Sequence, residues 1–297
     1  MGAGPPPSLR TDSLTNMQPA PQRKPTMQRF EWQDLPEGVR TVVEEASGAV
    51  VKAEAATEGL NSHLAAVLYT QSGSLFLKGI RTDHPAVTAQ QREAAINRHV
   101  RAVSPELLWH TEVDGWDLLA FKCVEGRHAD YTPGSSDLPK VVDVLTELGA
   151  IRAPELPLRR AEDRWAEHVD ESAALKLLAG ETLLHTDISP YNVLITKGQA
   201  RIIDWAWPTK GAAFIDPCYF AIRLMAAGHT AEQAEYWAGQ VPAWRDAPRE
   251  AVDAFVAISA RMWGEIASNA PADEWKRQMS EVAVSWAKFR HSRHSTR

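Results

Sequence analysis

The spacing of hydrophobic positions changes along the chain, and the change divides the chain into two parts. Up to about residue 124 these positions form short runs bounded by Gly, Ser and Asn, a pattern typical of strands. Beyond about residue 136 they recur every three or four residues, as in helices that bury one face. We therefore expect an α+β fold, with a strand-rich amino-terminal part and a mainly helical carboxy-terminal part.

The amino-terminal part predicts a five-stranded antiparallel sheet plus one helix. Short loops join its first three strands, so we expect these strands to form an antiparallel meander. The helix should span about residues 87–103, because Ile96, Val100 and Val103 form an apolar stripe at i, i+4 and i+7. The strands are expected at residues 49–52, 63–70, 75–80, 107–110 and 116–124.

The carboxy-terminal part predicts several helices. One of them is apolar nearly all round, as in a helix buried at the centre of a domain, and its Asp216 is a candidate for bonding a nearby loop backbone. Thr230 and Gln233 form a capping box that predicts a helix start. A further helix is expected to end at Gly180, because four apolar residues precede it at every fourth position. Those residues are Trp165, Val169, Ala173 and Leu177. The remaining helices are expected at residues 138–148, 214–227, 248–268 and 272–290.

Two short motifs carry the chemistry. The first runs from His185 to Asn192 and reads H-x-D-x₄-N, and the second reads Ile-Ile-Asp-Trp with its carboxylate at Asp204. Asp187 can accept the proton of a hydroxyl group, while Asn192 and Asp204 offer the hard oxygen ligands that Mg²⁺ prefers. Apolar runs flank both motifs and predict short strands that frame a loop. This pattern predicts phosphoryl transfer.

The motifs resemble those of a family of small-molecule kinases, the aminoglycoside phosphotransferase and choline-kinase-like group. Thr186 stands where that family usually has Gly, and Ala206 follows Trp205 where a protein kinase carries Gly. These departures argue against a protein kinase rather than against phosphoryl transfer. The resemblance implies a protein-kinase-like two-lobe fold, with an N-lobe at residues 27–125 and a C-lobe at residues 126–297. It also implies that His185 bonds the loop backbone and the segment near Asp204.

A lysine and a glutamate of the predicted N-lobe are expected to form an ion pair. Glu93 falls on the apolar stripe of the predicted helix, and a buried carboxylate needs a partner. Lys78, on the third predicted strand, is the natural partner, although it could instead be an edge lysine whose charge reaches solvent. Kinases use such a pair to hold the lysine on the phosphates of the nucleotide.

Further nucleotide contacts are implied by the resemblance. The loop that ends with Asn61 and Ser62 could lie over the phosphates, or it could be a plain hairpin turn. The backbone from Lys122 to Val124 would bond the purine, although these residues equally suit an ordinary core strand. The implied ligands are Mg²⁺ and a nucleoside triphosphate, either ATP or GTP. Trp205 and Trp207 could stack on a substrate ring, but core packing is the expected role of each.

Composition excludes several other classes of protein. The chain has 297 residues, is 44% hydrophobic and 24% charged, and carries a net charge of −6 with no basic cluster, which argues against nucleic-acid binding. No run approaches 18 apolar residues, so a membrane span is not expected. Cys123 and Cys218 lack metal-ligand spacing, and we expect them to be buried, reduced residues of a cytoplasmic protein. Residues 1–26 lack a burial pattern and predict a disordered tail, and Met27 is an alternative start.

Three functions compete at this stage. The leading one is an ATP-dependent O-phosphotransferase that acts on a hydroxyl of a small molecule, for example an aminoglycoside-like antibiotic. The second is a metabolite kinase for a choline-, homoserine- or sugar-like substrate. The third is a catalytically silent nucleotide-binding regulator, which would be expected to lack Asp187, Asn192 or Asp204. The motifs specify neither the acceptor, nor a choice between ATP and GTP, nor the oligomeric state.

Overall fold

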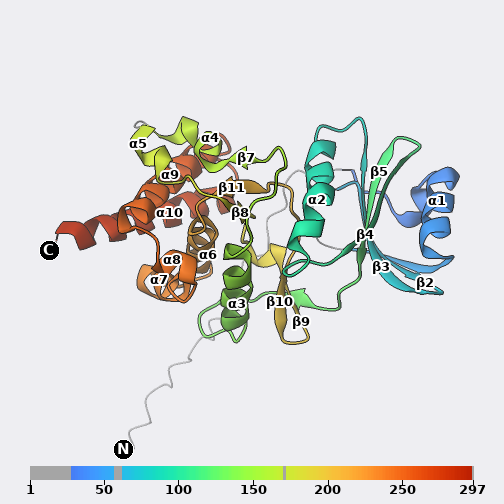
Figure 1. Cartoon of the computed structure of the whole chain (residues 1–297), viewed down its shortest axis with the longest axis horizontal. Coiled ribbons are helices and arrows are strands. Elements are labelled where there is room, and N and C mark those ends of the chain that lie inside the picture. The colour runs from blue at the N-terminus through green and yellow to red at the C-terminus, as the bar shows by residue number, and fades with distance from the viewer. Residues whose placement is uncertain (1–27, 57–61, 170–171, 296–297) are drawn as a thin grey trace, which may run out of the picture.

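The computed structural model describes residues 28–56, 62–169 and 172–295, and the predicted disordered tail lies outside these ranges. Figure 1 shows a sheet with helix α1 at one end of the molecule and a group of helices at the other. Helix α2 (Val87–Val100) lies between them. This is the predicted two-lobe α+β architecture.

The first lobe is built on a five-stranded antiparallel sheet with the strand order β1-β2-β3-β5-β4. All five predicted strands are confirmed, and β3 is the central strand. Sequence patterning left α1 (Glu37–Ser47) unassigned; it covers the sheet and buries Val39 and Val43. The strands are β1 (Val50–Ala55), β2 (Leu64–Thr70), β3 (Gly73–Arg81), β4 (Leu107–Val113) and β5 (Trp116–Lys122).

Helix α2 joins the two cores of the molecule. Its apolar residues Ile96 and Val100, with Val103 just beyond its end, are fully buried and pack into the core of the helical lobe. The predicted stripe is therefore correct, although the helix itself ends at Val100 rather than Val103. The same helix carries Glu93. Packing against the second lobe therefore fixes the position of Glu93, while the Glu93 carboxylate faces the first lobe.

The second lobe is mainly helical, as predicted. Helix α6 (Ile215–Ala226) is buried over most of its length at the centre of this lobe. The capping box is confirmed, since the Gln233 N–H donates to Thr230 Oγ1 at 3.2 Å and the Thr230 N–H donates to Gln233 Oε1 at 2.9 Å. The other main helices are α3 (Leu138–Gly149), α7 (Ala231–Ala238), α9 (Arg249–Ser268) and α10 (Glu274–Ser295). The short elements near the motifs are α4 (Ala161–Arg164), β8 (Thr182–Leu184), β9 (Val193–Thr196) and β10 (Gln199–Ile202).

The continuous helix predicted up to Gly180 is wrong. The chain leaves the helical region at Trp165 (φ −109°, ψ 11°) and is extended at Val169 (φ −133°, ψ 132°), so three short pieces replace the helix. Trp165 is buried against Phe255, with ring centroids 5.3 Å apart, while Ala173 is exposed. The four apolar residues thus do not share one helix face.

Two composition-based expectations can also be compared with the structure. Among the described residues, none of the helices has the length and apolar character needed to span a membrane. Cys218 is buried as predicted, but Cys123 is only partly buried, so the expectation of burial is wrong for that thiol.

Candidate active site

The loop after β8 is held by a buried carboxylate from α6. The backbone N–H groups of His185 and Thr186 donate to the two oxygens of Asp216, each at 2.8 Å. This confirms the expectation that Asp216 bonds a loop backbone. Burial raises the pKa of Asp216, while its two N–H donors favour the charged form. Thr186, at φ 67°, adopts a left-handed conformation that Gly adopts more easily, and its hydroxyl donates to Trp207 O at 3.1 Å.

His185 connects the two motifs. Its Nδ1 accepts the Asp187 N–H at 3.2 Å, so Nε2 carries the proton and donates to Ile203 O at 3.0 Å. The ring also lies edge-on to Trp205, with centroids 4.8 Å apart. His185 therefore bonds both the loop backbone and the segment next to Asp204.

Both carboxylate oxygens of Asp187 have partners in the protein, and the side chain is also partly exposed to solvent. Asn192 Nδ2 donates to Oδ2 at 3.0 Å and to the Asp187 carbonyl at 3.0 Å. Arg223 Nη2 lies 2.9 Å from Oδ1. The Asp187 side chain is still 41% exposed, so a ligand can approach the carboxylate after its orientation has been fixed.

Asn192 and Asp204 are brought together through the backbone, because the Ile203 N–H donates to Asn192 O at 2.9 Å. The Asn192 amide nitrogen already donates to Asp187, which orients Oδ1 as the oxygen available for other contacts. Asp204 (φ 63°) has a side chain that is 24% exposed. One amide oxygen and one carboxylate on adjacent segments match the donor set that Mg²⁺ prefers.

Lys78 joins the sheet, α2 and the second motif. Its Nζ lies 2.6 Å from Glu93 Oε2 and 2.8 Å from Asp204 Oδ1, which confirms the predicted pair with Glu93. Burial alone would lower the pKa of Lys78, but these two carboxylates outweigh it and the pKa lies above its usual value. Glu93 also accepts the Trp205 N–H at 3.4 Å. The two carboxylates thus favour the charged form of the lysine and hold it against Asp204, one of the candidate metal ligands.

The other predicted nucleotide residues are only partly described. Asn61 lies outside the described residues, and Ser62 is buried. The Lys122 N–H donates to Glu106 O at 2.8 Å within the first lobe, so that group is already used. Val124, two residues on, is half-buried at the junction of the lobes. A purine contact from this segment remains a prediction.

Sequence reasoning missed three arginines beside the motifs. Arg223 contacts Asp187. Its guanidinium carbon lies 5.7 Å from the ring centroid of Trp263 and 5.3 Å from that of Trp275. The guanidinium carbons of Arg92 and Arg164 lie 5.7 and 5.6 Å from the ring centroid of Trp207. Trp205 packs in the core as expected, but Trp207 is 51% exposed, so core packing is wrong for that residue.

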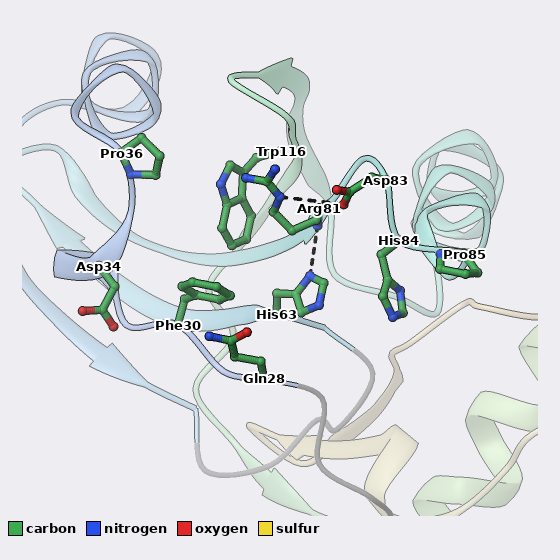
Figure 2. A pocket seen from close by; sticks show the side chains of 10 residues that line it. All are labelled: Gln28, Phe30, Asp34, Pro36, His63, Arg81, Asp83, His84, Pro85 and Trp116. Carbon is green, nitrogen blue, oxygen red and sulfur yellow. Dashed lines mark hydrogen bonds and ion pairs between the residues drawn. The ribbon is translucent and has the colours of Figure 1, made fainter.

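A cavity of about 460 Å³ lies elsewhere in the first lobe, at the end of β3 (Figure 2). His63, Arg81 and Trp116 line it together with the segment around Phe30, and His63 Nδ1 accepts the Arg81 N–H at 3.0 Å. None of the motif residues lines this cavity. The candidate active site is instead the region of the two motifs, where Lys78 contacts Asp204 and Asn192 links the segment before Asp204 to Asp187.

Comparison with known proteins places the chain in a fold class. A family model described as RIO domain matches residues 131–210, which is less than a third of the chain. The fold is that of two-lobe, kinase-like enzymes, shared with solved structures of choline kinases and aminoglycoside phosphotransferases. No curated protein sequence matches the chain.

Three of these structures illustrate how far the likeness extends. Choline kinase LicA from Streptococcus pneumoniae superposes with a TM-score of 0.56 at 11% identity, covering 84% of this chain and 97% of that one. A thermostable mutant of aminoglycoside phosphotransferase APH(4)-Ia, in a ternary complex with ADP and hygromycin B, gives a TM-score of 0.56 at 16% identity, covering 84% and 99%. A choline/ethanolamine kinase family protein from Mesorhizobium loti gives 0.55 at 17% identity, covering 85% and 93%. At these identities the likeness concerns the fold.

Proposed function

We propose that this chain is an O-phosphotransferase that transfers the γ-phosphate of a nucleoside triphosphate, ATP or GTP, to a hydroxyl of a small molecule. One observation carries the proposal: residues from the sheet, from α2 and from both motifs converge on one partly exposed site. Solved structures with the same fold include complexes with ADP and with AMP, which supports a nucleotide ligand. A cytoplasmic location, where nucleoside triphosphates are plentiful, fits this function.

Each residue has a distinct part in the proposed reaction. Asn192 and Asp204 would hold Mg²⁺, which when bound neutralises charge on the phosphates. Lys78, fixed by Glu93, contacts the phosphates of the nucleotide. Asp187 orients the acceptor hydroxyl and takes its proton, and the two bonds from Asn192 keep the carboxylate in place. Such a reaction gains mainly from alignment and charge stabilisation, so it needs no nucleophilic side chain.

The proposal is tested by nucleotide consumption across a panel of hydroxylated compounds, with amino-sugar antibiotics and polar metabolites both represented. We expect turnover that requires Mg²⁺ or Mn²⁺, stops on chelation and resumes when metal is added back. A protein that binds nucleotide yet transfers phosphate to no acceptor and to no water would instead be the silent regulator. A protein that binds no nucleotide would contradict both functions.

A further inference from the structure

Two arginines from different elements converge on one exposed tryptophan beside the proposed catalytic base. Arg92 comes from α2, Arg164 is the last residue of α4, and Trp207 follows Asp204 by three residues. Both guanidinium groups lie within 6 Å of the Trp207 ring centroid, close enough for cation–π contact. Thr186, next to Asp187, donates its hydroxyl to Trp207 O at 3.1 Å and so fixes this group against the loop.

The protein compensates the positive charge of this group only at a distance, because the carboxylates of Asp187 and Asp216 favour the charged form of Arg164 without an ion pair. Within the described ranges, neither Arg92 nor Arg164 has a carboxylate at ion-pair distance. Glu162, two residues before Arg164, pairs instead with Arg160 at 2.7 Å. Arg164 also lies 5.5 Å from the ring centroid of Trp165, and Arg92 Nη1 donates to Ala206 O at 3.4 Å. Burial of Arg164 lowers its pKa, because it disfavours the charged form.

The positive charge beside Trp207 acts on Asp187, the proposed base. The Asp187 carboxylate is close enough to favour the charged form of Arg164, and Arg223 contacts Asp187 directly at 2.9 Å. The Asp187 carboxylate therefore has two arginines near it, with Arg223 in contact and Arg164 farther away. In a chain with a net charge of −6, a group of arginines beside the first motif does not follow from composition.

We infer that the acceptor is an anion: its hydroxyl faces Asp187 while its carboxylate or phosphate group is bound by Arg92 and Arg164 beside Trp207. This inference rests on the proposed function. A guanidinium group offers paired N–H donors that match either anion, and stacking on an indole holds its plane in place. Aminoglycosides and choline are cations, so this site would repel them.

The chemical step is then the following. The acceptor oxygen forms a bond to the γ-phosphorus, and its proton passes to the Asp187 carboxylate. The bond between the γ-phosphorus and the bridging oxygen breaks, and its electron pair stays on the nucleoside diphosphate. The anionic group of the acceptor takes no part in bond making, and its contact with the two arginines serves to orient the hydroxyl.

The test uses four small acceptors that differ in charge: D-glycerate, glycerol 3-phosphate, glycerol and serinol. Binding is measured by calorimetry with Mg²⁺ and a non-hydrolysable nucleotide, and transfer is measured as nucleoside diphosphate release. We expect at least one of the two anions to exceed glycerol and serinol by about tenfold or more, the scale of a charge-assisted hydrogen bond. Which anion does so identifies the carboxylate or the phosphate as the bound group.

Variants then assign this preference to the arginines. Arg92→Gln and Arg164→Gln should each lower the affinity for the preferred anion about tenfold, while the nucleotide Kd changes less than about twofold. Arg164→Lys keeps the charge but loses the paired donors, so it should recover part of the loss. Arg293→Gln is the matched control, because Arg293 also lies over an aromatic ring, 5.3 Å from the Phe289 centroid, on α10.

The outcomes separate this inference from the proposed function. Binding of Mg²⁺–nucleotide with no preference for the anions, or a preference for serinol, would overturn the anionic acceptor and leave the phosphotransferase standing. An anion preference that survives in Arg164→Gln and Arg92→Gln would overturn the assigned site. A wild-type chain that binds no nucleotide would overturn the proposed function, and the acceptor assignment with it.

Discussion

The two sides of the candidate active site balance charge in opposite ways. On the proposed nucleotide side, Lys78 lies within 2.8 Å of two carboxylates, and all three side chains are largely shielded from solvent. On the proposed acceptor side, Arg92 and Arg164 lie over an exposed tryptophan, and no described carboxylate forms an ion pair with them. The proposed nucleotide side already contains its countercharges, so its side chains are ordered before a ligand binds. On the proposed acceptor side, an anionic ligand would supply the countercharge.

The largest expected effect is on the nucleotide side. Asp204→Ala removes a proposed metal ligand and one of the two carboxylates that hold Lys78, so turnover should fall below detection. Steady-state turnover at saturating Mg²⁺ measures this. Asp246→Ala, at an exposed aspartate, is the control and should be fully active. Near-normal kcat in Asp204→Ala, with metal stripped and re-added, would contradict the assignment.

A smaller loss of activity is expected for substitution of Asp187, the proposed base between the two sides. Asp187→Asn keeps the size of the side chain and most of its hydrogen bonds but cannot accept the proton. Transfer should fall by roughly 10² to 10⁴, the usual range for general acid–base catalysis. Pre-steady-state transfer at saturating nucleotide measures this step. An unchanged rate would show that another group takes the proton.

The next largest loss of activity is expected at Arg223, the arginine that positions the proposed base Asp187. Arg223→Gln removes the 2.9 Å contact with Asp187 and should lower kcat about tenfold, with little change in nucleotide KM. Arg223→Lys should restore part of the activity because it returns the charge to the same place. A thermal melt is needed alongside, since Arg223 is buried beside Trp263 and Trp275. A loss of stability with unchanged kcat would leave Arg223 with a structural role only.

The smallest expected effect is on the stability of the fold, and it should leave both sides of the site unchanged. His110 Nε2 lies 2.8 Å from the buried Asp117 carboxylate, and this hydrogen bond raises the pKa of His110. A raised pKa stabilises the fold below about pH 6.5, the ordinary value for histidine, and this contribution is lost as pH rises through the folded-state value. Because His110 is partly exposed, the loss should not exceed about 1 kcal/mol. Denaturant melts across this range should show it, and His110→Gln should flatten the trend.

The arrangement of the proposed nucleotide side could be predicted from sequence because its residues belong to local patterns. Asp187 and Asn192 share one motif, and Glu93 was identified as a carboxylate on an apolar stripe that needed a partner. The five strands followed from their own short apolar runs in the same way. Asp216 was identified as a polar residue on a buried helix, and its bonds to the loop confirm that argument.

The acceptor side could not be predicted because it depends on tertiary packing alone. Arg92, Arg164 and Trp207 are far apart in sequence, and no pattern links them. The stretch after Arg164 suggested one long helix, whereas Trp165 turns the chain into the core and so sets where Arg164 lies. Arg223 lies on the same buried helix as Asp216 and carried the same signal, an isolated polar residue on an apolar helix, which could have marked it as a functional residue.

The most direct test of the account measures nucleotide Kd and single-turnover rate for Asp187→Asn and Lys78→Ala side by side. We expect Asp187→Asn to bind nucleotide almost normally and to transfer phosphate slowly. Lys78→Ala should bind nucleotide more weakly and also transfer slowly, because it removes the amine that we propose contacts the phosphates. If Asp187→Asn instead lost nucleotide binding while transferring normally at saturation, the division of the site into a nucleotide side and an acceptor side would be wrong.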